Sequence, residues 1–268
     1  MFQYKNSSLL PSSYNRKFGF QPNNSPYGQT LTPTLSHRRG SSSGFTLAET
    51  LIALVIVGVV AALTVPTMIA KYHKEQTVTR LKKTYSALSQ TTARAVSDNG
   101  PISTWELGRK NNRADAKVFF DKYMAPYLSL MGESKEIPSI ANELCHYLNG
   151  SICTDDANAY SKAYLADGTS LTFNINESSE NNHQFKIVID INGDKKPNVY
   201  GKDIFQFKYY ISFSDPTLVG RFVPNGFDNT RQQLLSNSNY QCNKNKQGFR
   251  CAALIIKDGW QIKDDYPW

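Results

Sequence analysis

A long apolar stretch near the N-terminus constrains this chain more than any other feature. Residues 50–70, TLIALVIVGVVAALTVPTMIA, contain no charged side chain. As a helix rising about 1.5 Å per residue, they would extend roughly 31 Å, which matches the hydrocarbon core of a bilayer at about 30 Å. The apolar core of a secretory signal is shorter, at about 7–15 residues, and its cleavage site follows it. The stretch is therefore predicted to enter a membrane and to stay on the mature protein.

A small-residue cleavage site precedes the apolar stretch instead of following it. Gly44 lies directly before Phe45, and Arg38 and Arg39 lie just upstream. Cleavage after Gly44 would make Phe45 the charged amino terminus. Glu49 then places a carboxylate at the start of the span, although a charge near the centre of a span costs at least about 2.5–3.5 kcal/mol. Such a charge usually has a pairing function, and the alternative is a carboxylate that snorkels to water.

The hexapeptide GFTLAE at residues 44–49, with the apolar stretch after it, resembles the class III signal of type IV pilins and type II secretion pseudopilins. The resemblance implies that a prepilin peptidase cuts after Gly44 and methylates Phe45. It also implies that Glu49 meets the amino terminus of the adjacent subunit during fibre assembly. Gly58 and Pro66 stand where such pilins commonly have a glycine and a proline. Pro66 is expected to kink the helix because it lacks a backbone N–H.

The pattern beyond the apolar stretch becomes amphipathic. Apolar and small side chains recur at spacings of three and four, which predicts that the helix continues and packs on a globular head. The sequence DNGP at 98–101 then ends it. The predicted parts are a removed leader at 1–44, a transmembrane half-helix at 45–70, an amphipathic half-helix at 71–98 and a head at 99–268. The stripe comprises Val78, Leu81, Tyr85, Leu88, Thr92 and Ala95.

The head is predicted to have an α+β fold. Residues 113–130 have the pattern of a second amphipathic helix, interrupted near Pro126. Alternating or β-branched runs then predict strands of an antiparallel sheet, so the whole is expected to be pilin-like, with the long N-terminal helix packed on the sheet. The predicted strands are 170–176, 185–192, 203–212 and 251–258. The aromatic tail at 259–268 is expected to cover the sheet.

The four cysteines fall in two local pairs, Cys145 with Cys153 and Cys242 with Cys251. An even number in spaced pairs indicates disulfides in an oxidising compartment. The alternatives are free thiols in a cytosolic domain and a zinc site that includes His146, although no pair has the two- to four-residue spacing of zinc knuckles. The family resemblance favours disulfides, because type IV pilins often staple a C-terminal loop as Cys242 and Cys251 would. The other bridge would clip the loop after the second helix.

Alternate oxygen side chains at Asp190, Asn192 and Asp194 raise the question of a Ca²⁺ site. The glycine of this segment is fourth rather than sixth, no glutamate closes the loop, and Lys195 and Lys196 add adverse charge. A polar turn between two strands is therefore the favoured interpretation. The Ca²⁺ alternative stays open because some type II major pseudopilins bind calcium in the head, although no matched residue carries that property over. No other cofactor is expected.

The net charge of +8 does not predict a nucleic-acid partner. Residues 1–44 contain five basic side chains and no acidic one, so the remainder of the chain carries only +3. The four histidines lie outside any HExxH, nucleophile-elbow or phosphate-cradling motif. The chain is therefore expected to be the substrate of an enzyme, prepilin peptidase, and not an enzyme itself.

These features predict a structural subunit of a type IV pilus or a type II secretion pseudopilus, and the general pattern of the head favours secretion. The expected partners are like and unlike pilin-like subunits, prepilin peptidase, an inner-membrane assembly platform and membrane lipid. The alternatives are a monomeric membrane-tethered module for binding, DNA uptake or adhesion, and a membrane-anchored hydrolase. Loss of assembly on replacing Glu49 would distinguish a fibre subunit from a simple anchor.

The predicted location is a single pass through the inner membrane with a periplasmic head, followed by a periplasmic or extracellular fibre. Basic residues just past residue 70 would favour the reverse topology by the positive-inside rule. The signal motif argues against the reverse topology. The reverse topology would place the four cysteines in the reducing cytosol and the cleavage site on the wrong face of the membrane.

Overall fold

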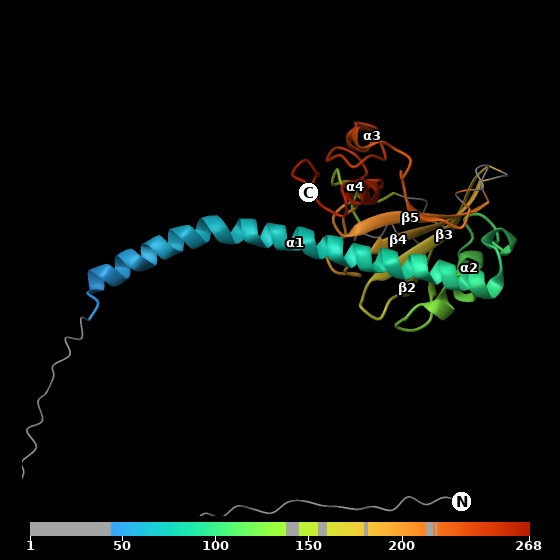
Figure 1. Ribbon diagram of the computed structural model, residues 1–268, viewed down its shortest axis with the longest axis horizontal. Coiled ribbons are helices and arrows are strands. Elements are labelled where there is room, and N and C mark those ends of the chain that lie inside the picture. The colour runs from blue at the N-terminus through green and yellow to red at the C-terminus, as the bar shows by residue number, and fades with distance from the viewer. Residues whose placement is uncertain (1–43, 138–144, 155–159, 180–181, 213–216, 218) are drawn as a thin grey trace, which may run out of the picture. The chain divides into compact units, whose positions relative to one another are not determined.

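The computed structural model describes residues 44–137, 145–154, 160–179, 182–212, 217 and 219–268 (Figure 1). The chain divides into two compact units, Met1–Ala53 and Leu54–Trp268. The helices are α1 (Leu47–Asn99), α2 (Arg113–Tyr123), α3 (Arg231–Leu235) and α4 (Cys251–Lys257), with 3₁₀ turns η1 (Ile102–Thr104) and η2 (Ala125–Tyr127). The strands are β1 (Lys135–Ile137), β2 (Tyr160–Tyr164), β3 (Ser170–Ser179), β4 (Asn182–Asp190), β5 (Ile204–Ser212) and β6 (Phe222–Pro224). The predicted leader up to residue 43 lies outside the described residues.

A six-stranded antiparallel sheet forms the centre of the second unit, with the strands in chain order from β1 to β6. Apolar side chains align across it: Phe173 lies opposite Ile187, and Ile187 lies opposite Phe207. Side chains two residues apart on a strand share a face, so the neighbouring rows extend the same apolar surface. Those rows are Leu171–Ile189–Phe205 and Ile175–Phe185–Tyr209, all buried. The predicted α+β, pilin-like architecture is confirmed.

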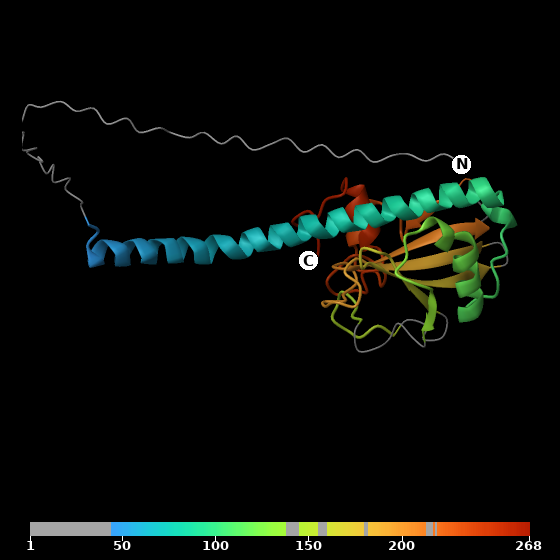
Figure 2. The same ribbon diagram turned by 90° about the horizontal axis from the view of Figure 1, so that it is seen from below.

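The C-terminal half of α1 runs across this apolar face, and α2 packs beside it (Figure 2). Leu81, Leu88 and Ala95 recur every seven residues and are completely buried. The hydroxyl of Tyr209 on β5 donates to the Leu88 carbonyl at 2.8 Å, which fixes the helix on the sheet. The predicted amphipathic stripe is therefore confirmed as core packing. The helix continues through Pro66 as one element, and the kink expected there stays a prediction.

The prediction of a strand at 251–258 is wrong, because these residues form the helix α4. A short apolar run such as CAALIIK fits a buried helix as well as a buried strand, and period alone does not separate them. Cys251 to Ile255 are all buried, so α4 shows no polar face that would have revealed a helical pattern. The predicted second helix is confirmed but shorter, since α2 ends at Tyr123 and Pro126 lies in the separate turn η2.

Both predicted disulfides are present, Cys145–Cys153 and Cys242–Cys251, and none of the four cysteines is free. Cys145 and Cys153 belong to a second, smaller apolar cluster that includes Val188 of β4. Val188 points to the opposite face from Ile187, so this cluster covers the other side of the sheet. Cys242–Cys251 ties the loop between the two cysteines to the start of α4.

Candidate processing and assembly site

The bond between Gly44 and Phe45 lies in exposed chain just before α1 begins at Leu47. The Phe45 side chain is 85% exposed, and no atom of the described residues lies within 4 Å of the space where a Cβ would stand on Gly44. A protease must draw an extended segment into its active site, and within the described residues neither Gly44 nor Phe45 makes a hydrogen bond that would oppose this. Both residues of the predicted cleavage site are therefore accessible.

Thr46 and Glu49 form a reciprocal capping box at the start of α1. The backbone N–H of Thr46 donates to Glu49 Oε2 at 2.8 Å, and the Thr46 hydroxyl donates to the same oxygen at 2.9 Å. In return, the Glu49 N–H donates to Thr46 Oγ1 at 3.2 Å. These bonds satisfy backbone donors that have no partner inside the helix, and a Thr-x-x-Glu sequence is the usual signature. Thr46 is thus a site residue that sequence reasoning missed, although the spacing was visible.

The capping box occupies only part of the Glu49 carboxylate. An ionised carboxylate offers about four acceptor positions, and Oε1 makes no hydrogen bond within the described part of the chain. Glu49 is exposed, so Oε1 is open to a donor from outside the chain. The carboxylate can therefore cap its own helix and, at the same time, accept a hydrogen bond from an amine outside the chain.

The residues of α1 that follow this box present apolar side chains all round the helix. Leu54, Leu63 and Met68 are 68%, 71% and 69% exposed, and none of the most apolar part of the helix is buried. Within the described residues, α1 is the one helix long and apolar enough to cross a membrane. A continuous exposed apolar surface of this length requires lipid or other apolar helices around it.

Comparison with known proteins identifies the family. A model described as a family of unknown function (DUF6613) matches residues 67–268, about three quarters of the chain. The chain belongs to this family. A second model, the prokaryotic N-terminal methylation motif, matches residues 39–65 of this DUF6613 protein. No curated protein and no solved structure matches it.

The methylation motif includes Gly44, Phe45 and Glu49, so this DUF6613 protein carries a type IV pilin-like prepilin signal and is a prepilin-peptidase substrate of that class. The signal, together with the apolar helix, indicates membrane anchoring with the head outside the cytoplasm.

The predicted Ca²⁺ ligands lie at the end of β4 (Asp190) and in the turn that follows it (Asn192 and Asp194), as the favoured interpretation predicts. Asp194 forms an ion pair with Lys162 and accepts a hydrogen bond from the Tyr164 hydroxyl at 2.7 Å. Asp190 accepts the Asn192 N–H at 3.1 Å instead. No group of three or more histidine, cysteine or acidic side chains that could hold a metal ion occurs in the described ranges. The ion-binding role stays a prediction.

Asp203, which is not among the residues predicted from the sequence, is the carboxylate whose charge acts most strongly on Asp190. It accepts the backbone N–H groups of Asn198 and Val199, at 2.8 and 2.6 Å, and the Asn192 amide at 3.2 Å. Burial raises its pKa despite these bonds. Burial first, and then the charge of Asp203, raise the pKa of Asp190 to about 8. The pair therefore holds a proton at neutral pH.

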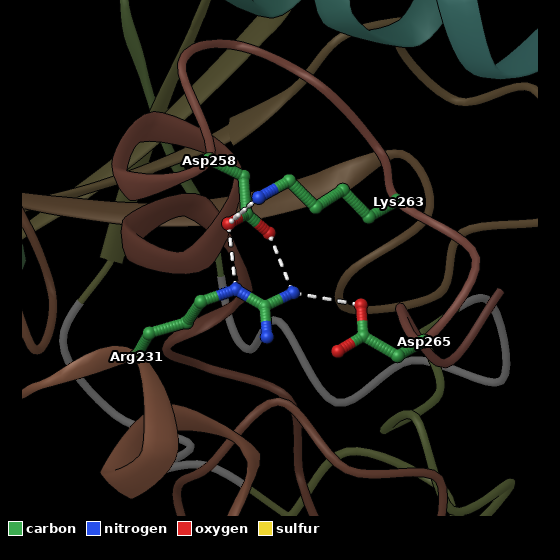
Figure 3. Close-up of polar contacts among 4 residues, drawn as sticks. All are labelled: Arg231, Asp258, Lys263 and Asp265. Atoms are coloured by element: carbon green, nitrogen blue, oxygen red, sulfur yellow. Dashed lines mark hydrogen bonds and ion pairs between the residues drawn. The ribbon is translucent and has the colours of Figure 1, made fainter.

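A polar network fastens the C-terminal tail to the head (Figure 3). The side chain of Asp258, only 1% exposed, receives Arg231 Nε at 2.7 Å, Arg231 Nη2 at 3.1 Å and Lys263 Nζ at 2.9 Å. Arg231 Nη2 also reaches Asp265 at 2.7 Å. Burial raises the pKa of Asp258, but the hydrogen bonds from Arg231 and Lys263 outweigh it and hold the pKa below its usual value. The network joins α3, the end of α4 and the tail.

Proposed function

We propose that this protein is a structural subunit of an envelope fibre of the type IV pilus and type II secretion pseudopilus class. Prepilin peptidase removes residues 1–44 and methylates Phe45, and α1 anchors the subunit in the inner membrane with its head in the periplasm. An assembly platform then adds it to a fibre of like and unlike pilin-like subunits. The role of the chain is structural rather than enzymatic.

The observation that carries this proposal is the position of Glu49. It lies one helical turn after Phe45, on an otherwise apolar helix, and its Oε1 has no partner in the described chain. A carboxylate in lipid is costly, by at least about 2.5–3.5 kcal/mol near the centre of a span and by less toward its ends. The amine of Phe45 on an incoming subunit would neutralise it, and methylation keeps that positive charge. The cost thus favours assembled over free subunits, by up to roughly 100-fold.

Two variants separate the docking charge from the helix cap. Glu49→Gln removes the charge but keeps the capping box, because glutamine at this position makes the same backbone bond. Thr46→Ala removes the hydroxyl bonds of the capping box but keeps the charge. We expect the Gln variant to be processed and left in the membrane, and the Ala variant to assemble. The measurement is the amount of processed subunit in sedimentable fibres relative to the amount in the membrane.

Assembly of both variants to the wild-type level would overturn the docking role of Glu49, and the absence of sedimentable fibres in the wild type would favour a monomeric membrane-tethered module. Loss of assembly in Thr46→Ala alone would show that the cap matters and the charge does not. The location of wild-type fibres separates the two members of the class: fibres sheared from the cell surface indicate a pilus, and fibres confined to the periplasm indicate a pseudopilus.

A further inference from the structure

A groove of about 760 Å³ lies between residues 67–79 of α1 and residues 260–264 of the C-terminal tail. This volume is within the range of about 300–1,000 Å³ found for pockets that hold small molecules. Its walls include Thr67 and Ala70, the last part of the apolar run, and then Lys71 and Lys74. The groove therefore begins where the exposed apolar surface of α1 ends.

The tail wall of the groove is held in place by contacts on both sides. Trp260 packs against Tyr85 of α1 with ring centroids 5.3 Å apart, and Lys82 Nζ lies 5.9 Å from the centre of the Trp260 ring. On the far side, the network of Asp258 and Arg231 fixes the tail to α3 and α4. The groove is thus preformed, and the partly buried ring of Trp260 lines it.

The charge around the groove is mainly positive. Residues 71–83 of α1 contain five cationic side chains and one carboxylate, Glu75. Glu75 lies 4.0 Å from Lys71 with both side chains well exposed, and such a pair is worth little. Lys74 has no ion-pair partner in the described part of the chain. The lining itself holds two lysines, Lys71 and Lys74, and two carboxylates, Glu75 on the helix and Asp264 on the tail. Lys82, beside the Trp260 ring, adds positive charge at the rim, so the helix side of the groove is the side that favours an anion.

The sequence of side chains along α1 sets the depth of the groove in a membrane. Apolar residues up to Ala70 belong in the hydrocarbon, and Lys71 marks the start of the headgroup layer, where lysine and tryptophan are favoured. We propose that the groove holds the phosphate of an anionic phospholipid headgroup, with Lys71 and Lys74 as donors and Trp260 against the lipid. The proposal rests on the membrane-anchored stage of the proposed function.

The three tryptophans allow a direct test with the full chain in lipid nanodiscs. The chain is labelled with 5-fluorotryptophan, and single Trp→Phe variants assign the ¹⁹F resonances of Trp105, Trp260 and Trp268. Trp105 is an internal reference, because it is buried and stacked on Tyr123 at 4.5 Å. Phosphatidylglycerol is titrated into phosphatidylcholine. We expect the Trp260 resonance to shift with phosphatidylglycerol and the Trp105 resonance to stay fixed.

Lysine variants connect this shift to the groove. Lys71→Gln and Lys74→Gln are each expected to raise the mole fraction of phosphatidylglycerol needed for half the shift about fivefold, since a lysine at a membrane surface contributes about that factor. The double variant should show no transition. The control is Lys244→Gln with Lys246→Gln, a pair in the Cys242–Cys251 loop that should behave like wild type.

Four results would overturn the inference. A Trp260 resonance that ignores phosphatidylglycerol, or a shift that survives the double variant, removes the lipid site. A shift that follows the protein-to-lipid ratio at fixed lipid composition assigns the groove to a second copy of the chain. An equal shift with soluble glycerol phosphate assigns it to free phosphate. Flotation with the lipid tests the anchor separately, because a chain that does not float contradicts the proposed function itself.

Discussion

The stability of the head should fall as pH rises, because of the buried pair Asp190 and Asp203. A carboxyl with a pKa of 3.8 in the unfolded chain and about 8 in the folded chain keeps its proton in the folded state while the unfolded state loses it. The unfolded state is therefore favoured progressively between about pH 4 and pH 8. Above pH 8 both states are ionised, and the loss is complete. Asp203 has a raised pKa as well and contributes with the same sign.

The size of the effect follows from the shift in the pKa of Asp190. The rise in the pKa from 3.8 to about 8, at about 1.36 kcal/mol for each tenfold change in proton affinity, sets a ceiling of about 5–6 kcal/mol on the loss in the free energy of unfolding. Asp190 keeps some exposure, and the Asn192 N–H hydrogen bond stabilises its charged form, so the measured loss will be smaller. We expect a loss of at least about 1.4 kcal/mol between pH 5 and pH 8, which corresponds to a tenfold change in proton affinity.

The assay is thermal unfolding of the full chain in detergent, followed by near-ultraviolet circular dichroism between pH 5 and pH 9. Asp190→Asn has the same shape and no charge at any pH, so it should be more stable than wild type at pH 8 and should depend much less on pH. A wild-type stability that is constant or rises from pH 5 to pH 8 would refute the reasoning. So would an Asp190→Asn variant with the wild-type slope.

Three further changes test other parts of the head. Replacing Cys242 and Cys251 by serine should lower the free energy of unfolding by about 2.6 kcal/mol, because the disulfide closes a loop with a sequence separation of 9 and so reduces the entropy of the unfolded chain. Chemical denaturation measures this loss, and an unchanged midpoint would contradict it. Arg231→Gln should lower the free energy of unfolding by about 1–2 kcal/mol, because the buried Asp258 then keeps Lys263 as its one cationic partner in the network. The loss is limited because the Arg231 side chain is partly exposed. A loss below about 0.5 kcal/mol would contradict the role of the network. Because Asp194 is already paired, millimolar Ca²⁺ should leave the melting temperature unchanged, whereas a rise that Asp190→Asn abolishes would establish an ion site.

Long, strongly patterned segments could be predicted from the sequence. The strands β3, β4 and β5 alternate apolar and polar side chains over many residues, and their core rows follow from that alternation. The short strands β1 and β6 have three residues each, too few for a pattern, and they exist because a neighbouring strand offers backbone partners. The same limit makes the sequence of α4 look like a strand, since five of its seven residues are buried in succession and show no period.

The candidate site was predictable where it is local in sequence. Gly44, Phe45 and Glu49 lie within six positions, and the Thr46 cap lies between them. Asp203 could not be found in this way, because pairing of β4 with β5 places Ile204 opposite Asp190 and so brings Asp203 beside it. The groove at Trp260 depends likewise on the fold, which returns the tail to α1. Trp260 packs against Tyr85 of α1, whose ring in turn lies against Phe207 of β5 and Phe222 of β6.

The central claim is that the chain is processed at Gly44 and keeps its apolar helix. The most direct measurement is the intact mass of the mature protein extracted from membranes, together with fragmentation of its first peptide. The account predicts a chain that begins at Phe45, carries one methyl group on that amine and retains Glu49. A chain that keeps residues 1–44, or one that begins after the apolar run at Lys71 or beyond, would contradict it.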